Sequence, residues 1–166
     1  MAINPKTAIK SYVPAFTVIS FLLFLACTPS TTFSEFHSFP QTMWDKNEPI
    51  RFTVPINDTT QRYDFFIQVR NNNQYPFSNL WLFVDVKMPD GTVRSDTINI
   101  TLADVYGKWL GKGISLYTYS HFHKNIQFPN TGDYIFTIRQ GMRSDIITGI
   151  SEVGIRLEPN NQPINQ

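Results

Sequence analysis

Two histidines placed two positions apart are the residues of this chain best spaced for metal chemistry. His121 and His123 would lie on one face of a β-strand, from which two imidazoles can reach one metal ion. No further histidine, cysteine or acidic side chain lies close to them in the sequence, and His37 is remote. We therefore expect no metal site and interpret the pair as solvent-facing side chains of a strand or loop.

The motifs of common catalytic and nucleotide-binding sites are absent from the sequence. There is no Gly-x-Ser-x-Gly elbow and no His-Glu-x-x-His sequence, and the 8 glycines, all at or after Gly91, form no phosphate-binding loop. The carboxylates are scattered, and no pair stands out for acid–base work. We expect no enzyme and no cofactor. A hydrolase, the alternative, would need a cleft in which carboxylates or histidines converge.

A glycine-rich segment at residues 106–113 carries two large apolar residues on what should be a turn. Its three glycines permit backbone conformations that other residues avoid, and Trp109 and Leu110 stand between them. One interpretation is a binding loop in which Trp109 anchors a partner. The other, which the sequence favours, is that Trp109 folds back over one end of the protein core.

A second segment, residues 139–143, places two arginines around a flexible Gly-Met pair directly after a predicted strand. The Arg143 guanidinium could clamp a carboxylate or bind backbone carbonyls of a neighbouring loop, because it offers several donors in a planar fork. An ordinary exposed charge explains the residue equally well. Trp109, Leu110 and Arg143 are the candidate partner-binding residues.

The N-terminus has the pattern of a lipoprotein signal. Lys6 and Lys10 precede a 14-residue stretch, Val13 to Ala26, of which 11 residues are apolar. This is shorter than the roughly 20 residues of an ordinary membrane span and fits a secretory signal. It ends at Cys27, and the small residue before this cysteine resembles the lipobox of bacterial lipoproteins. We predict a cleaved signal peptide at 1–26 and lipid, such as palmitate, on Cys27. The alternatives are a plain signal peptide and an uncleaved anchor.

Charge and cysteine content limit the partners and the domain plan. With 14 Lys+Arg and 13 Asp+Glu the net charge is +1, so we expect no nucleic acid as a partner. A single cysteine excludes an internal disulfide framework. We predict a lipid-anchored tether at 27–35, one folded domain at 36–158 and a disordered tail at 159–166.

The residues after the signal favour β-structure. They include 14 Ile, 14 Thr and 20 aromatic residues, but one Ala and 6 Leu. Apolar and polar residues alternate in 63–70 and 80–88, and a Pro-Asp-Gly turn at 89–91 joins the second segment to a strand at 92–100. Further strands are predicted at 50–54, 114–116, 121–128, 134–138 and 153–157. The sequence thus predicts an all-β protein, a two-sheet antiparallel β-sandwich of immunoglobulin-like or jelly-roll-like type.

Two details of this predicted sandwich bear on function. In the strand with the two histidines, Phe122, Ile126 and Phe128 are expected to face the core, with the histidines on the opposite side. Residues 71–79 lack periodicity and should form a loop. We expect this loop and the 106–113 loop to share one end of the sandwich and to make the partner contact, since binding residues concentrate on loops held by a rigid scaffold.

An ordered series of short motifs runs along residues 27–158. It comprises Cys27, Trp44, 56–59, 70–71, 75–80, 89–91, 96–97, 109–113, 132–134, 140–143 and 149–156. No single motif is diagnostic, but their order resembles the GldH family of gliding-motility lipoproteins of the Bacteroidota.

The resemblance implies a cell-envelope lipoprotein, lipidated at Cys27 and anchored in the outer membrane. It implies a role in gliding motility and in the associated type IX protein secretion, with other motility or secretion lipoproteins and envelope proteins as partners. No catalytic residue is carried over. The residues after Cys27 lack the acidic cluster associated with surface-exposed lipoproteins of that phylum, so we expect a domain that faces the periplasm.

A carbohydrate-binding lipoprotein of the envelope is the alternative function. β-Sandwiches with exposed aromatic side chains often bind glycans, and Trp81, Trp109 and Tyr119 could stack on sugar rings. An exposed row of these rings would favour this function, whereas buried tryptophans would count against it.

Overall fold

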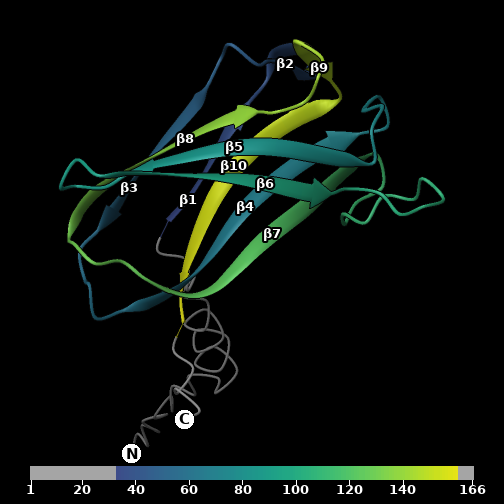
Figure 1. Cartoon of the computed structure of the whole chain (residues 1–166). Helices are drawn as coiled ribbons and strands as arrows, with labels where there is room; N and C mark the ends of the chain where they lie inside the picture. The colour runs from purple at the N-terminus through teal and green to yellow at the C-terminus, as the bar shows by residue number, and fades with distance from the viewer. Residues whose placement is uncertain (1–32, 161–166) are drawn as a thin grey trace, which may run out of the picture.

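The structure, a computed structural model that describes residues 33–160, is built almost entirely of β-strands (Figure 1). Two four-stranded antiparallel sheets share one hydrophobic core, and the predicted all-β, two-sheet antiparallel sandwich is confirmed. In chain order the elements are β1 (Phe33–Ser38), the 3₁₀ turn η2 (Pro40–Thr42), β2 (Met43–Asp45), β3 (Ile50–Ile56), β4 (Arg62–Asn72), β5 (Asn79–Lys87), β6 (Val93–Thr101), β7 (Leu116–Gln127), β8 (Gly132–Gln140), β9 (Ile146–Thr148) and β10 (Ile150–Pro159).

The sheet order determines which strands lie at the edges. One sheet, here the β4 sheet, has the order β1-β10-β4-β7, and the other, the β5 sheet, has the order β3-β8-β5-β6. The short strands β2 and β9 pair with each other as a separate ribbon. Figure 1 shows this ribbon at one end of the sandwich. Among the described residues no helix is long and apolar enough to cross a membrane.

Alternation of apolar and polar residues accounts for several of the strands. Along β4, buried and half-buried residues alternate without interruption, and β3 alternates buried with exposed ones. The β5–β6 hairpin closes as predicted, because the Met88 N–H donates to the Thr92 carbonyl (2.8 Å) and the Asp90 carboxylate accepts the Thr92 N–H (2.8 Å). Local alternation and the turn signal are therefore sufficient to predict these strands and the hairpin.

The folded domain extends beyond the predicted boundaries at both ends. β1 begins at Phe33, which pairs with Leu157 and packs against the core, so the sheet starts three residues before the predicted start at 36. β10 continues to Pro159, and the Asn160 N–H donates to the Arg62 carbonyl (2.8 Å). The predicted signal peptide and Cys27 lie outside the described residues.

Strand β7 turns its two histidines inward, which corrects the prediction that they face solvent. In the antiparallel register with β4, His121 lies opposite Ile67 and His123 lies opposite Phe65. Paired residues of an antiparallel sheet share a face, and both partners belong to the buried core. The imidazoles are consequently half-buried between the sheets.

The reversed facing of β7 has a local cause. Phe122, predicted to point inward, lies on the outer face, where it stacks on Phe66 with ring centroids 4.6 Å apart. The register with β4 then shifts, and Asn125 adopts the left-handed conformation with φ of 59°. After this bulge Ile126 and Phe128 point inward. The prediction assumed unbroken alternation back from these two residues, and it therefore placed Phe122 and the histidines on the wrong faces.

Candidate functional site

The two predicted loops lie at the same end of the sandwich, and Trp109 connects them. Its indole N–H donates to the Asn73 side-chain carbonyl (2.9 Å), and its ring lies 6.5 Å from that of the buried Tyr75. The Asp104 carboxylate shapes the loop by accepting two backbone N–H groups, each at 2.9 Å. Trp109 is half-buried against the core. This geometry fits the interpretation in which Trp109 folds back over the core.

Leu110 and Arg143 lie on different surfaces. Leu110 is 51% exposed and lines a shallow hollow with Lys112 and Tyr119 over the β4 sheet. Arg143 lines a groove on the outer face of the β5 sheet. The three candidates from the sequence therefore do not form one site, and the groove around Arg143 is the surface that also gathers exposed aromatic side chains.

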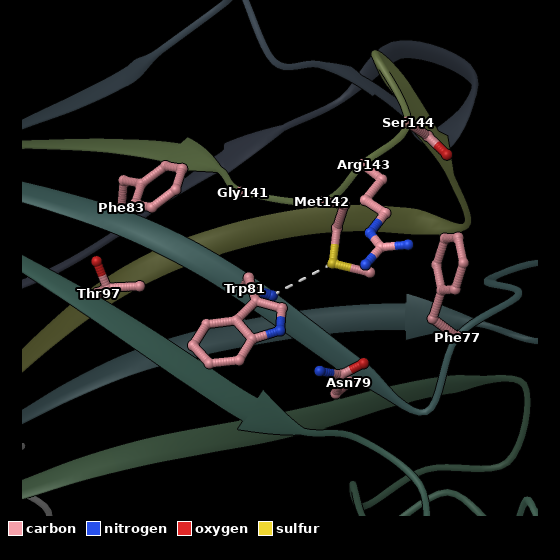
Figure 2. A pocket seen from close by; sticks show the side chains of 9 residues that line it. All are labelled: Phe77, Asn79, Trp81, Phe83, Thr97, Gly141, Met142, Arg143 and Ser144. Carbon is pink, nitrogen blue, oxygen red and sulfur yellow. Dashed lines mark hydrogen bonds between the residues drawn. The ribbon is translucent and has the colours of Figure 1, made fainter.

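This groove, here called the aromatic groove, has a volume of about 470 Å³. It brings together one loop residue before β5, outward residues of β5 and β6, and the segment that follows β8 (Figure 2). Its lining consists of Phe77, Asn79, Trp81, Phe83, Thr97, Gly141, Met142, Arg143 and Ser144.

Strand alternation presents the aromatic side chains of the groove. Leu80, Leu82 and Val84 of β5 are buried, so Trp81 and Phe83 point outward and are 40% and 43% exposed. The Phe83 ring lies across Gly141, where an added Cβ would stand 2.9 Å from the ring. A side chain at this position would therefore require the exposed Phe83 ring to shift.

Backbone contacts fasten the segment after β8 to the edge of β5. The Gly141 N–H donates to the Trp81 carbonyl (2.7 Å). The Trp81 N–H donates to the Met142 thioether sulfur (3.4 Å), the hydrogen bond drawn in Figure 2. These contacts place the Met142 side chain beside the Trp81 indole. The groove thus combines aromatic rings and a polarizable thioether, a pairing that adapts well to apolar partner groups.

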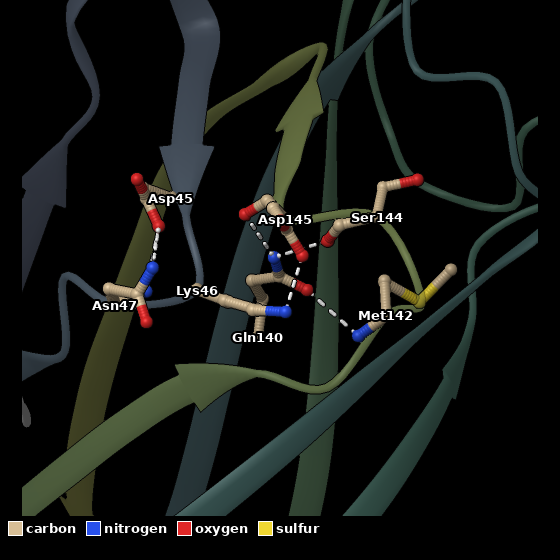
Figure 3. A network of polar contacts seen from close by, with 7 residues as sticks. All are labelled: Asp45, Lys46, Asn47, Gln140, Met142, Ser144 and Asp145. Carbon is tan, nitrogen blue, oxygen red and sulfur yellow. Dashed lines mark hydrogen bonds and ion pairs between the residues drawn. The ribbon is translucent and has the colours of Figure 1, made fainter.

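A buried amide holds this segment in place from below. Gln140 is 3% exposed; its Nε2 donates to the carbonyls of Ser144 (3.0 Å) and Asp145 (3.1 Å), and its Oε1 accepts the Met142 N–H (2.8 Å) (Figure 3). Lys46 pairs with the Asp145 carboxylate. The network fixes the turn on which Arg143 is carried.

Arg143 itself is exposed, and its charge has no partner within residues 33–160. None of the four ion pairs there, and none of the side-chain hydrogen bonds, includes its guanidinium. By contrast, Arg139, four residues earlier, pairs with Asp85 at 2.7 Å on the same sheet face. The groove therefore offers an unpaired cation beside exposed aromatic rings.

The histidine pair does not build a metal centre in the described part of the chain. Its rings lie edge to face with centroids 4.9 Å apart, and no group of three His, Cys, Asp or Glu side chains stands close enough there to hold an ion. Burial lowers the pKa of His121, and the neighbouring His123 lowers it further, against a smaller opposing effect of Asp96. His121 is therefore biased toward its neutral form.

The three side chains proposed to stack on sugars are not assembled into a row. Trp81 is exposed in the aromatic groove, Trp109 is half-buried at the loop end, and Tyr119 packs against the core from β7. A different aromatic set, Phe77 and Phe83 with Trp81, shares one surface. The outward alternation of 81 and 83 carried a signal for this set that the sequence reasoning missed.

Gln140 was missed as well, although its sequence position is informative. It follows Tyr134, Phe136 and Ile138 in phase, and all three are buried. A polar residue that continues an inward-facing series has to find hydrogen-bond partners in the interior. This pattern predicts a structural amide, but not which carbonyls it binds.

Comparison with known proteins agrees with the sequence resemblance. The GldH lipoprotein family model matches residues 31–157. A gliding motility lipoprotein GldH homolog of Christiangramia forsetii is 33% identical over 165 residues, covering 94% of this chain and 99% of the relative. The gliding motility lipoprotein GldH of Flavobacterium johnsoniae is 29% identical over 148 residues, covering 85% and 92%.

Solved structures resemble this chain only distantly. TmCBM61 in complex with β-1,4-galactotriose aligns with a TM-score of 0.35 at 10% identity, over 79% of this chain and 90% of that one. A fructofuranosidase from Schwanniomyces occidentalis aligns with a TM-score of 0.36 at 11% identity, over 79% and 34%. The assignment rests instead on the family match and on relatives aligned over nearly their full length: the chain belongs to the GldH family of gliding-motility lipoproteins.

Proposed function

We propose that this lipoprotein is a non-catalytic component of the gliding-motility machinery and of the associated type IX secretion, and that it contacts an envelope partner through the aromatic groove. One observation carries the choice of surface: the Arg143 guanidinium, unpaired among residues 33–160, lines the same groove as the exposed rings of Trp81 and Phe83. Arginine and tryptophan are the residues most enriched where binding energy concentrates in protein interfaces.

The anchor gives this contact its setting. Lipid on Cys27 would confine the domain to the outer membrane, and we expect it to face the periplasm. Two or more acyl chains give stable anchoring. Confinement raises the effective concentration of the domain toward other envelope components, so a modest groove contact is sufficient. Trp109 and Leu110 lie outside the groove, and we assign them a supporting role at the neighbouring loop end.

Affinity purification of the tagged, lipidated protein from its own envelope tests the proposal. We expect motility or secretion proteins to be recovered with it, and recovery to fall about tenfold for Trp81→Ala and for Arg143→Glu. Cys27→Ala should also weaken recovery, because it releases the domain from the membrane. Phe122→Ala, at a 36% exposed aromatic on the outer face of the β4 sheet, and Arg51→Glu, at an exposed arginine of β3, are the matched controls.

Two outcomes would contradict the proposal. Unchanged recovery by Trp81→Ala and Arg143→Glu would place the contact on another surface. Recovery of no protein, with retention of the native chain on a glycan resin, would favour the carbohydrate-binding alternative. In that case the exposed set of Phe77, Trp81 and Phe83 is the surface to test, and Trp81→Ala should abolish retention.

A further inference from the structure

A second cavity opens between the two sheets along the side of the sandwich formed by the edge strands β6 and β7. Its volume is about 340 Å³, and both sheets contribute to its lining. This cavity, here called the inter-sheet cavity, shares no residue with the aromatic groove. Its volume lies within the roughly 300–1,000 Å³ typical of ligand pockets.

The interior of the inter-sheet cavity is apolar and aromatic. Phe65 of β4 stacks on Phe136 of β8 with ring centroids 5.1 Å apart, and Phe128 meets Tyr134 edge to face at 4.8 Å. The Tyr134 hydroxyl is already satisfied, since it donates to the Asn130 carbonyl (3.0 Å) and accepts the Asn130 N–H (3.1 Å). The ring of Tyr134 thus adds apolar surface without an unpaired polar atom.

The rim of the cavity is polar, and its side chains occupy inward positions of the two edge strands. In the β5–β6 register Arg94 lies opposite Val86 and Asp96 opposite Val84, and both valines line the cavity. From β7, His123 completes the rim. Apolar side chains at these positions would close the sandwich, as they do in its centre; the polar ones leave a mouth that water can reach.

The charges of the rim are unequally engaged. Arg94 belongs to none of the four ion pairs formed among residues 33–160. The Asp96 carboxylate accepts the Thr97 backbone N–H at 2.7 Å. An anionic group at the mouth would therefore be attracted to Arg94 and kept to that side by repulsion from Asp96.

An apolar interior with an unpaired cation at its mouth is complementary to an amphiphile with one hydrocarbon chain. A cavity of roughly 150 Å³ holds one benzene molecule, so about 340 Å³ holds on the order of a dozen heavy atoms. We propose that the inter-sheet cavity binds one medium-length fatty acid, with the chain between the sheets and the carboxylate beside Arg94. This site stands independently of the partner contact in the aromatic groove.

Photo-crosslinking tests this site in the full lipidated protein held in lipid nanodiscs. The probe is dodecanoic acid that carries a photoreactive diazirine on its chain, and the labelled peptides are identified by mass spectrometry. We expect labelling within residues 84–98 and 123–136, and we expect unlabelled dodecanoate to compete for it. Dodecanol, of the same chain length but without the charge, should compete about tenfold less well.

Variants separate the cavity from incidental labelling by membrane lipid. Val86→Trp near the end of β5 and Met88→Trp directly after it fill the cavity and should each reduce labelling at least tenfold. The melting temperature of each variant shows that it is folded. Arg94→Gln should weaken competition by dodecanoate about tenfold, and Asp96→Asn should strengthen it. Lys87→Trp, at an exposed outward position of the same β5 strand, is the control and should label normally.

Three results would overturn the proposal. One is labelling that dodecanoate does not compete. Another is labelling that survives Met88→Trp in the folded variant. The third is equal competition by dodecanol and dodecanoate, which would show that Arg94 does not bind the carboxylate. In each case the inward charges of β6 would be left with the simpler role of preventing an edge strand from pairing with other chains.

Discussion

The outer faces of the two sheets use aromatic side chains in opposite ways. On the β4 sheet three rings are each covered by a cation, and two of these cations are also ion-paired, which leaves little of the charge for a partner. The contacts are Arg70 over Phe36 (4.2 Å), Arg156 over Phe66 (4.2 Å) and Lys124 over Phe122 (5.4 Å), with Glu152 pairing Arg70 and Glu158 pairing Arg156.

On the β5 sheet the same residue types remain uncombined. No cation–ring contact among residues 33–160 involves Trp81, Phe83 or Phe77, and Arg143 has no carboxylate partner there. Exposure of aromatic rings alone therefore does not mark a binding surface, since both sheets carry exposed rings. What distinguishes the β5 face is that its rings and its cation have made no contact with each other, so both remain available to a partner.

Removing the buried Gln140 amide, which supports the outer face of the β5 sheet, should have the largest effect on stability. Gln140→Leu leaves the Met142 N–H and two carbonyls without their partner in the interior, so we expect the free energy of unfolding to fall by about 3 kcal/mol. Urea denaturation measures this. Gln68→Leu, at a half-buried glutamine of β4, is the control and should change it by less than about 0.5 kcal/mol. Equal effects of both variants would mean that the Gln140 network does not hold the turn.

Removing a cation from over a ring on the outer face of the β4 sheet should reduce stability by a smaller amount. Arg156→Ala removes the cation over Phe66 and the partner of Glu158, and we expect a loss of about 1.5 kcal/mol of unfolding free energy. Partner recovery should not change, because this face makes no contact with the aromatic groove. Arg51→Ala serves as the control. A strong loss of partner recovery by a folded Arg156→Ala variant would assign binding to the β4 face instead.

Placing a cation over the exposed rings of the β5 sheet should weaken partner binding without affecting the fold. Thr97 lies opposite Phe83 in the β5–β6 register and lines the groove. Thr97→Lys would bring an ammonium over the aromatic rings, as Lys124 does on the other sheet, and we expect about tenfold weaker partner recovery. Unfolding free energy should change by less than about 0.5 kcal/mol. Thr53→Lys, outward on β3 and away from the groove, should leave recovery unchanged.

The smallest expected effect concerns His121 on the edge strand β7, which should make stability depend on pH. The folded state lowers the pKa of His121, chiefly through burial, so the unfolded state binds its proton more readily. Stability from this group is complete above the unfolded value, about 6.5, and is lost as pH falls through that value toward the lower folded one. His123, Asp96 and Arg94 are the charged or titratable groups nearby.

The measurement is the melting temperature at pH 7 and at pH 5. We expect His121→Gln to reduce the difference between these two temperatures by no more than a few degrees. Thr53→Gln, at an exposed residue of β3 that does not titrate, is the control and should leave the difference as it is. A larger difference in His121→Gln than in the native chain would mean that the folded state favours the protonated imidazole, contrary to the direction argued here.

Several elements of the fold follow from local patterns that a sequence displays directly. The alternation in β4 and β5 and the turn at 89–91 predicted the central hairpin and much of the core. The three-residue strands β2 and β9 were not predicted, because a segment so short shows no period. The polar composition of β1 also concealed a strand that only its pairing with β10 stabilises.

The candidate site was predictable only in part. Arg143 was a candidate from the sequence, but the aromatic rings that line the same groove come from other elements, and no local pattern joins them. The inward histidines were assigned to the wrong face because the bulge at Asn125 depends on the register with β4. The fold-back of Trp109 depends on Asn73 and Tyr75, from a distant loop.

The amino-acid sequence by itself determined the class of fold, the alternating core strands, the family and the residues with distinctive chemistry. These follow from composition, a period of two residues and the order of short motifs along the chain. The tertiary structure alone decided which of those residues meet. Trp81 and Met142 lie 61 positions apart and touch because β5 pairs with β8, and Arg94 and His123 border one cavity because their strands are the free edges of facing sheets. Contacts between distant segments depend on sheet order and register, which no local pattern encodes.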